Sequence, residues 1–273
     1  MSHFSASRAM VQASHPLPAL AVSAVAAGLA LSADRTPASV VIATAAVFAG
    51  QLSVGWLNDL VDAPRDALVG RRDKPVATGA IGPGAVRAAF IVSAGAAVVL
   101  SLFSAPLGAA AHLAALLSAW AYDLGVKASA FSVAPFAFSF GLLPVFLFLG
   151  APQAPLPPLW LIGAAAALGS AAHFVNVLPD LADDDATGVR GLPHRMGPRG
   201  GRIAAAALVL TASGLLVFGP GGPPTTLTLT AVPLSVAILV AGFLLDRRPR
   251  SRAAFRAVML VALIDVALLL HTG

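Results

Sequence analysis

Predominantly apolar stretches, each about 20 residues long, dominate this sequence and are separated by short segments rich in Pro, Gly and charge. A helix of about 20 apolar residues is long enough to cross a bilayer, and it satisfies its own backbone hydrogen bonds in lipid. We therefore expect an all-α polytopic membrane protein with about nine transmembrane helices in one bundle. The predicted spans are residues 17–33, 38–57, 83–103, 106–122, 130–150, 157–178, 203–219, 225–245 and 253–271.

The composition excludes a soluble protein. Only 11% of the 273 residues are charged, against roughly 25% in soluble domains, and the mean hydropathy is +0.86. The absence of Cys excludes a disulfide scaffold and thiolate chemistry. The net charge of +5 does not indicate a nucleic acid partner, because the basic residues follow the membrane topology. The expected surroundings are membrane lipids.

The basic residues predict how the helices are oriented. Those on one side of the predicted topology are Arg8, Arg65, Arg71, Arg72, Lys74, Lys127, Arg190, Arg195, Arg199, Arg202, Arg247, Arg248, Arg250 and Arg252. The loops on the opposite side contain only Arg35. The positive-inside rule then makes the first side cytoplasmic, with the N-terminus in and the C-terminus out, in a plasma or inner membrane. The last four arginines of this set are interpreted as a topology signal and as contacts to anionic lipid.

One polar pattern, N-x-x-x-D-x-x-x-D-x-x-x-G-x-R, occurs twice at the cytoplasmic ends of predicted spans. The first copy consists of Asn58, Asp62, Asp66, Gly70 and Arg72, and the second of Asn176, Asp180, Asp184, Gly188 and Arg190. Each residue of the second copy follows its counterpart by 118 positions. We expect a single domain over residues 1–273, built as two four-helix repeats at about 17–127 and 130–250 plus a final helix at 253–271.

The spacing places three oxygen-bearing side chains along one helix face in each copy, because positions i, i+4 and i+8 are neighbours on a helix. We name Asn58, Asp62 and Asp66 the first ladder, and Asn176, Asp180 and Asp184 the second ladder. Solvated loop ends are the simpler interpretation, but eight of the twelve acidic residues lie in these two segments. Adjacent carboxylates repel each other unless a cation lies between them, and hard oxygen ligands favour Mg²⁺ bridged to phosphate. The ladders therefore predict Mg²⁺ and a diphosphate, with Arg72, Lys74 and Arg190 against its outer oxygens.

Four motifs in order are similar to those of the UbiA-type intramembrane prenyltransferases. They are Asn58-Asp59-x-x-Asp62-x-x-x-Asp66, Lys74-Pro75-Val76-Ala77-Thr78-Gly79, Tyr122-Asp123-Leu124-Gly125-Val126-Lys127, and Asp180-x-x-x-Asp184 followed by Gly188 and Arg190. Lys74 stands where the family usually has Arg. The resemblance extends over the whole chain, because the family has nine transmembrane helices.

The resemblance implies a Mg²⁺-dependent transfer of an isoprenyl group from an isoprenyl diphosphate to a hydrophobic acceptor. Diphosphate leaves, an allylic carbocation forms, and a quinone precursor, another aromatic ring or a lipid hydroxyl attacks it. Metal binding is carried over to Asn58, Asp62, Asp66, Asp180 and Asp184, of which the four aspartates are catalytic. Substrate binding is carried over to Arg72, Lys74, Lys127 and Arg190, and Asn176 is added as a helper on the strength of the repeat. Tyr122 is assigned either to the diphosphate and carbocation or to the interfacial aromatic belt.

Further polar residues lie deeper in the predicted spans. Gln51 and His173 share the faces of the two ladders, so they either line the acceptor pocket or make interhelical hydrogen bonds. In the pocket, His173 would orient or deprotonate an acceptor hydroxyl. His112 and Asp265 are expected to make structural hydrogen bonds. Five phenylalanines are expected either to pack or to stabilise a carbocation, namely Phe136, Phe138, Phe140, Phe146 and Phe148.

Two other functions remain open at this level. A terpene cyclase of the same superfamily would let the carbocation react with its own chain, without an acceptor. A cation transporter would use the ladders as a permeation site, but its polar residues should continue through the middle of the membrane. Here polarity is concentrated at the cytoplasmic ends of the spans.

Overall fold

The computed structural model describes residues 3–151, 153, 156–221, 225–245 and 251–272, and these residues form helices and no strands. The helices are α1 (His3–Ala13), α2 (Pro16–Ser32), α3 (Pro37–Leu68), α4 (Pro83–Ser101), α5 (Pro106–Leu124), η1 (Val126–Ala128), α6 (Ala134–Leu149), α7 (Leu159–Val177), η2 (Leu178–Asp180), α8 (Leu181–Ala186), α9 (Leu192–Phe218), α10 (Thr226–Leu245) and α11 (Ala253–Thr272). The all-α prediction is confirmed.

Four of the described helices are long and apolar enough on their own to cross a membrane: Pro37–Leu68, Pro83–Ser101, Leu159–Ala186 and Leu192–Phe218. The pair Ala6–Ala13 and Pro16–Ser32, bent by 54°, adds a fifth if it is counted as one span. Every predicted span contains a helix. The number of nine crossings and the internal duplication stay predictions.

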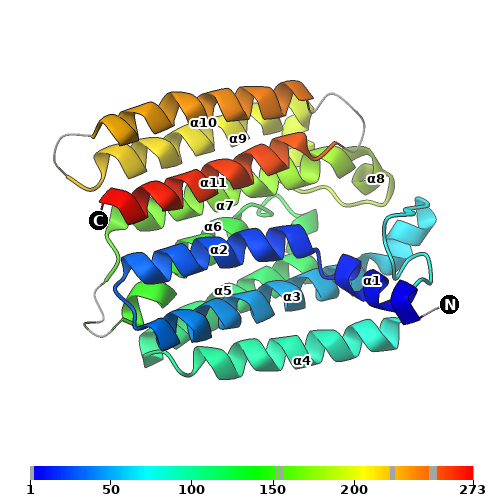
Figure 1. The fold of residues 1–273 in the computed structure, drawn as a ribbon. Coiled ribbons are helices and arrows are strands. Elements are labelled where there is room, and N and C mark those ends of the chain that lie inside the picture. The colour runs from blue at the N-terminus through cyan, green and yellow to red at the C-terminus, as the bar shows by residue number, and fades with distance from the viewer. Residues whose placement is uncertain (1–2, 152, 154–155, 222–224, 246–250, 273) are drawn as a thin grey trace.

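The long helices lie side by side in a single bundle (Figure 1). Consecutive helices pack most extensively, notably α3 with α4, α5 with α6, and α7 with both α6 and α9. Helix α11 also packs against α2 and α7, which lie far from it in the sequence. The N-terminal and C-terminal parts of the bundle are therefore joined along α11.

Prolines set where many of the helices begin. Pro16, Pro37, Pro83 and Pro106 are the first residues of α2, α3, α4 and α5. At this position the missing N–H has no intrahelical partner to lose, and the fixed φ of proline suits the first turn. The side chain of Thr36 adds a cap to α3 by accepting a hydrogen bond from the Ser39 N–H at 3.4 Å.

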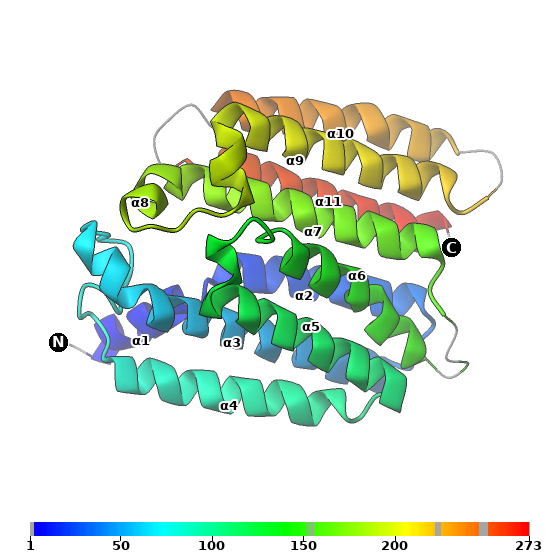
Figure 2. The same ribbon diagram turned by 180° about the vertical axis from the view of Figure 1, so that it is seen from behind.

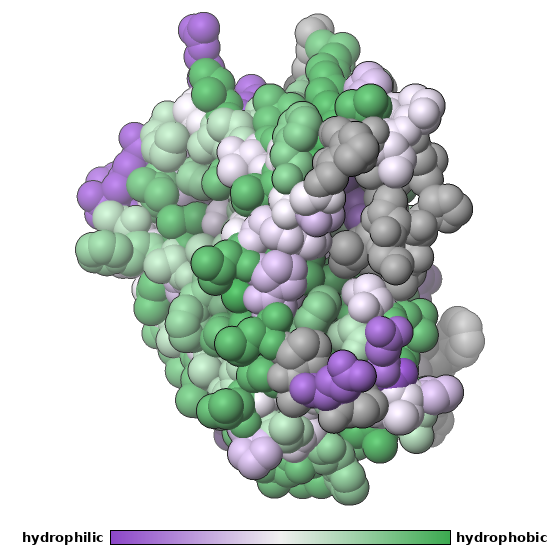
Figure 3. Space-filling view, turned by 90° about the vertical axis from the view of Figure 1, so that its left-hand side faces the viewer, coloured by the Kyte–Doolittle hydropathy of each residue, from purple (hydrophilic) through white to green (hydrophobic). Residues whose placement is uncertain are grey.

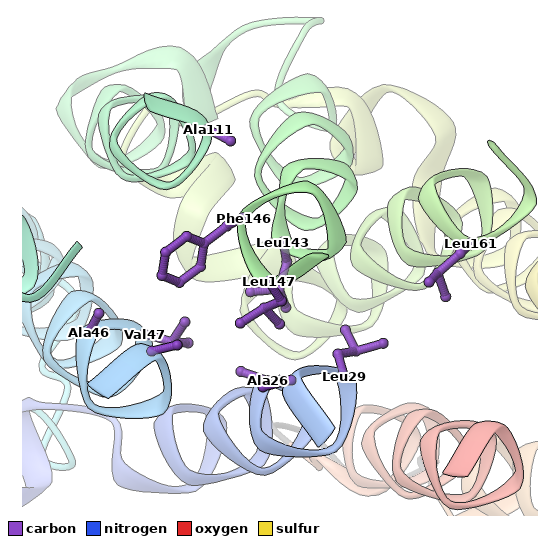
Figure 4. Packing of buried hydrophobic residues seen from close by; sticks show 11 residues of the cluster. Ala26, Leu29, Ala46, Val47, Ala111, Leu143, Phe146, Leu147 and Leu161 are labelled. Atoms are coloured by element: carbon purple, nitrogen blue, oxygen red, sulfur yellow. The ribbon is translucent and has the colours of Figure 1, made fainter. Parts of the chain in front are cut away.

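The interior of the first half is built around α6. The side chains of Phe146 and Leu147 are completely buried and pack against Ala26 of α2, Ala46 of α3 and Ala111 of α5 (Figure 4). Small residues on the facing helices let the backbones approach closely, which is how helices associate inside membranes. A second cluster joins α7, α9, α10 and α11.

The structure differs from the sequence prediction at the ends of three helices. Helix α3 continues to Leu68 beyond the predicted end at residue 57, so the first ladder lies wholly on a helix. The second ladder does not lie on one continuous α-helix, since Pro179 falls in the 3-10 turn η2 between α7 and α8. Helix α9 begins well before residue 203, with a kink at Gly197, which has a φ of +70°. Helix α1 was not predicted.

One end of the bundle gathers the segments that carry the ladders. Helix α8, helix α1 and the segment after α3 lie together at the end marked N, in both views (Figures 1 and 2). The opposite end is seen in Figure 3, where hydrophilic residues form separate patches on a largely apolar surface. The chemistry-bearing residues are therefore concentrated at one end.

Candidate functional site

A cavity at this end of the bundle brings the two ladders together. All six ladder residues line it, from α3 on one side and from α7, η2 and α8 on the other. Predicted residues Gln51, Lys74, Tyr122, Lys127 and His173 line it too. Side chains from α2 and α11 complete the wall.

The first ladder is buried against cationic and amide groups. The side chain of Asn58 donates a hydrogen bond to Asp62 Oδ2 at 3.0 Å. Lys127, in the 3-10 turn η1 after α5, forms an ion pair with the other oxygen of the same carboxylate. Asp62 and Asp66 are only 3% and 4% exposed. Carboxylates buried this deeply persist as charges only when paired with cations.

The second ladder is held by residues that the sequence did not indicate. Arg252, just before α11, donates hydrogen bonds to Asn176 Oδ1 at 3.2 Å and to Asp180 Oδ2 at 3.4 Å. His194 Nε2 lies 3.4 Å from Asp184 Oδ2. The interpretation of Arg252 as only a topology and lipid signal is therefore wrong, because its side chain turns back into the cavity. Arg247, Arg248 and Arg250 lie outside the described residues.

Two further arginines lie between the ladders, and one of them bridges the two. Arg65 lies 2.9 Å from Asp62 of the first ladder and 3.1 Å from Asp184 of the second. Arg71 contacts Asp180 at 2.9 Å and makes a two-pronged pair with Asp73, in which both N–O distances are 2.8 Å. The Arg71 guanidinium lowers the pKa of the Asp73 carboxyl well below its usual value. The ladders thus face each other across a layer of positive charge.

Lys74 is surrounded by groups from two segments, α3 and the junction between α1 and α2. Its ammonium donates hydrogen bonds to Asp59 Oδ1 at 2.9 Å and to Asn58 Oδ1 at 3.3 Å. It also lies 3.9 Å from Asp66 Oδ2 and 3.3 Å from the ring of His15. His15 sits between α1 and α2 with a left-handed φ of 52°. The unpredicted helix α1 therefore ends at the wall of the cavity.

Two predicted substrate ligands do not line the cavity. Arg72 is exposed and Arg190 pairs with Asp185 at 2.8 Å on the surface. For Arg72 the reason lies in the turn after α3, where Gly70 adopts a φ of +69° and the helical register ends. This turn buries Arg71 and leaves its neighbour Arg72 outside. The arginine that lines the cavity, Arg71, directly precedes the predicted ligand Arg72.

The deeper part of the cavity is aromatic. The ring of Tyr122 meets those of Phe136 and His173 edge-on, with centroid distances of 5.0 Å and 5.6 Å. Phe140 also lines the cavity, whereas Phe138 is exposed and Phe146 belongs to the core. Tyr122 therefore does more than form part of an interfacial belt, and Phe136 and Phe140 do more than pack, because all three side chains line the cavity.

The other intramembrane polar residues lie apart from the cavity or at its edge. His112 Nδ1 and Ser101 Oγ are 2.6 Å apart, which is the structural hydrogen bond expected. Asp265 is buried, and its Oδ2 has no hydrogen-bond partner among the described residues. Neither side chain lines the cavity.

The oxygen donors of the cavity fit a hard divalent cation. Asp123, which the sequence analysis did not single out, accepts a hydrogen bond from Asn58 at 3.1 Å through Oδ1. In the described part of the chain, Asp123 Oδ2 and Asp66 Oδ2 are buried and accept no hydrogen bond. No three acidic or histidine side chains of that part already converge as metal ligands, since basic groups stand between them. A cation bound here would replace some of these ion pairs.

The comparison with protein families decides the classification. The model of the UbiA prenyltransferase family matches residues 19–264. The chain belongs to the UbiA prenyltransferase family. The resemblance found in the motifs is thereby confirmed, and the chain is an integral membrane protein. No curated protein sequence matches it.

Solved structures of UbiA homologues share the fold. The apo homologue from Aeropyrum pernix K1 superposes with a TM-score of 0.74 at 16% identity, over 91% of this chain and 95% of that one. A homologue from Archaeoglobus fulgidus bound to GPP and Mg²⁺ gives a TM-score of 0.72 at 16% identity, over 96% and 99%. Its complex with DMAPP and Mg²⁺ gives 0.70 at 16% identity, over 97% and 99%.

Proposed function

We propose that this UbiA-family protein is a Mg²⁺-dependent intramembrane prenyltransferase. It transfers an isoprenyl group from an isoprenyl diphosphate to a hydrophobic acceptor, either an aromatic quinone precursor or another acceptor of a lipid pathway. The observation that carries the proposal is the cavity itself. Facing carboxylate ladders and a layer of cations occupy its polar end, and aromatic rings occupy its apolar end.

The relatives support the choice of substrate and metal. The Archaeoglobus fulgidus homologue has been solved with DMAPP or GPP together with Mg²⁺. This chain has the same fold and carries hard oxygen donors at one end of its cavity, which suit Mg²⁺. We assign Mg²⁺ to Asn58, Asp62, Asp66, Asp180 and Asp184. When bound, Mg²⁺ supplies positive charge that stabilises the diphosphate leaving group.

The basic side chains bind the diphosphate from the two sides. Lys74 and Lys127 belong to the first half of the chain, and both contact first-ladder residues. Arg71 and Arg252 contact Asp180 of the second ladder. If these ladder oxygens held Mg²⁺, the cations would be free to bind the outer oxygens of the diphosphate. Such preorganised charge is worth most where water is excluded and negative charge develops.

The apolar part of the cavity carries the reaction. The bond between C1 of the isoprenyl chain and the diphosphate oxygen breaks, and both electrons leave with the diphosphate. The allylic carbocation is shielded from water and faces the π-systems of Tyr122 and Phe136. A ring carbon or hydroxyl oxygen of the acceptor forms the new bond to C1 and then loses a proton. Gln51 and His173 lie on the acceptor side.

The basic loops support a site at the cytoplasmic face of a plasma or inner membrane, with the N-terminus in and the C-terminus out. The isoprenyl tail reaches the cavity from the lipid, and the diphosphate is released to the cytoplasm. The apolar length of the bundle accommodates a substrate of this kind.

The proposal is tested by incubating the purified protein in lipid with Mg²⁺, isoprenyl diphosphates of increasing chain length, and aromatic or lipid-hydroxyl acceptors. We expect diphosphate release and a prenylated acceptor, and both should disappear when EDTA removes Mg²⁺. A cyclised hydrocarbon formed without any acceptor would instead assign the chain as a terpene cyclase. Movement of Mg²⁺ across the membrane without product would assign it as a transporter.

A further inference from the structure

His173 occupies an unusual position among the cavity residues. It lies on α7 and is 1% exposed, and its ring is in contact with those of Tyr122 and Phe136. One ring nitrogen, Nε2, lies 3.0 Å from Ser132 Oγ. The other, Nδ1, is buried and has no hydrogen-bond partner in the part of the chain that the structure describes. A buried polar group without a partner costs about 1–3 kcal/mol, which points to a ligand.

Ser132 is held in place by the backbone at the start of α9. The N–H of Leu192 donates a hydrogen bond to Ser132 Oγ at 2.9 Å. This approach depends on Gly191, because a Cβ there would lie 2.6 Å from the carbonyl oxygen of Lys127 and 2.8 Å from Ser132 Oγ. Glycine at this position therefore lets the loop close on Ser132.

These contacts favour one position for the proton of the imidazole. Ser132 Oγ accepts a hydrogen bond from Leu192, and His173 Nε2 is the one acceptor within hydrogen-bond distance of the Ser132 hydroxyl among the residues that the structure describes. A neutral imidazole that accepts at Nε2 carries its hydrogen on Nδ1. An imidazolium would donate from Nε2 as well, and the Ser132 hydrogen would then lose this acceptor. The contacts thus favour the tautomer with hydrogen on Nδ1.

We propose that His173 Nδ1–H is a fixed hydrogen-bond donor for an oxygen of the acceptor substrate, set in this tautomer by Ser132 and the Leu192 N–H. The proposal rests on the proposed prenyl transfer and makes it more specific. The acceptor presents a hydroxyl or carbonyl oxygen beside its reacting atom, and its ring packs among Tyr122, Phe136 and Phe140. His173 then orients the acceptor and does not remove its proton, because Nδ1 is already protonated.

The first test measures the tautomer directly. In ¹⁵N-histidine-labelled protein, the ring signals of His173 are assigned by their loss in His173→Phe. We expect a protonated Nδ1 and an unprotonated Nε2, and a mixture of tautomers in Ser132→Ala. A hydrogen on Nε2 in the wild-type protein would overturn the proposal. This readout needs no turnover, so it stays informative even if the chain transfers no isoprenyl group.

The second test separates acceptor binding from donor binding. In His173→Phe we expect the KM for a phenolic acceptor to rise about 3- to 10-fold, the effect of one lost hydrogen bond. The Kd for an unreactive isoprenyl thiodiphosphate with Mg²⁺ should stay unchanged, which also shows that the variant is folded. His173→Gln keeps a hydrogen-bond donor, so its KM for the acceptor should lie between those of the wild type and of His173→Phe. An unchanged acceptor KM in both variants would mean that only water meets Nδ1 and would refute the proposal.

A matched control is available elsewhere in the bundle. His112 is also buried and also bonds a serine, Ser101, but it does not line the cavity. His112→Phe should leave the acceptor KM as it is in the wild type. An equal rise in both histidine variants would assign the effect to helix packing and would contradict the donor role. If the wild-type protein cyclises its substrate without an acceptor, the proposed function fails while the tautomer result stands.

Discussion

The carboxylates of the two ladders are the residues on which the proposed reaction depends most. Replacing Asp62 or Asp180 with Ala removes a proposed metal ligand, together with an ion-pair partner of Lys127 or of Arg71. We expect turnover to fall by at least about 100-fold in either variant, the scale of losing one group that stabilises developing charge. Product formation is measured at saturating Mg²⁺, with thermal unfolding to verify the fold. Asp185→Ala, on the surface, is the control, and retained activity in either ladder variant contradicts the metal assignment.

Arg71 and Arg72 provide a test in neighbouring residues of the same type. Only Arg71 is buried in the cavity wall and reaches the second ladder. Arg71→Ala should weaken the binding of an isoprenyl thiodiphosphate roughly 10-fold, because a charge-assisted hydrogen bond is lost. Arg72→Ala should bind it as the wild type does. Titration calorimetry of both variants gives the comparison, and the reverse order would support the ligand suggested by the repeated pattern.

The sequence predicts which residues share the cavity where the geometry is local. The register of Asn58, Asp62 and Asp66 follows from helical periodicity alone, and all three line the cavity. Arg72, which the repeated pattern suggested, lies outside the cavity because the chain turns at Gly70, with a φ of +69°, and helical periodicity does not describe a turn. Arg252 could be found only from the packing of α11 against α7.

Asp123 and His15 show what signals the sequence still contained. Asp123 is an acidic residue at the end of an apolar stretch, like the aspartates of the ladders, and this position could have indicated it as a residue of the site. His15 had no such signal, because its role depends on the bend between α1 and α2. His15 lies in an irregular segment, whereas Asp123 lies on α5, where the sequence did carry a signal.

At the scale of elements, the contact between the α1–α2 junction and α3 positions part of the site. A Cβ on Gly55 of α3 would lie 2.3 Å from the backbone oxygen of Ser14. Gly55→Ala should therefore push His15 away from Asp59 and Lys74, lowering the midpoint of thermal unfolding and weakening thiodiphosphate binding. Overpacking of this kind costs about 1–3 kcal/mol.

The control for this prediction lies on α4. Gly95 is also inside a helix, but a Cβ there would meet nothing within 4 Å. Gly95→Ala should keep or slightly raise the unfolding midpoint, because Ala favours the helix by about 1 kcal/mol over Gly. Equal unfolding midpoints for the two variants would show that the junction does not pack against α3 as described.

The elements themselves were largely predictable because long apolar stretches have few alternatives in lipid. The ends of the helices were not predictable in this way, because some polar segments at the cavity continue the helix beyond the apolar stretch. Helix α3 extends through the first ladder, whereas Pro179 breaks the corresponding stretch after α7. We propose that the two stretches descend from one repeated unit and have diverged at this proline.

At the scale of the whole molecule, the charge distribution predicts one orientation in the membrane. The chain contains no Cys, so single cysteines can be introduced without background. Leu156→Cys, at an exposed position between α6 and α7, should react with a membrane-impermeant maleimide added to intact cells. Asp185→Cys, at the ladder end of the bundle, should react only after the membrane is permeabilised. The opposite labelling pattern would place the site on the other face.

The central claim is that two carboxylate ladders from different parts of the chain clamp one metal-bound diphosphate. Its most direct test is an experimental structure with an isoprenyl thiodiphosphate and Mn²⁺ in place of Mg²⁺, in which anomalous scattering locates the metal. We predict metal peaks between α3 and the α7–α8 segment, with oxygens of Asp62 and Asp180 among the ligands and the isoprenyl tail beside Tyr122. Metal and diphosphate bound elsewhere, or ladders that lie apart in that complex, would contradict the account.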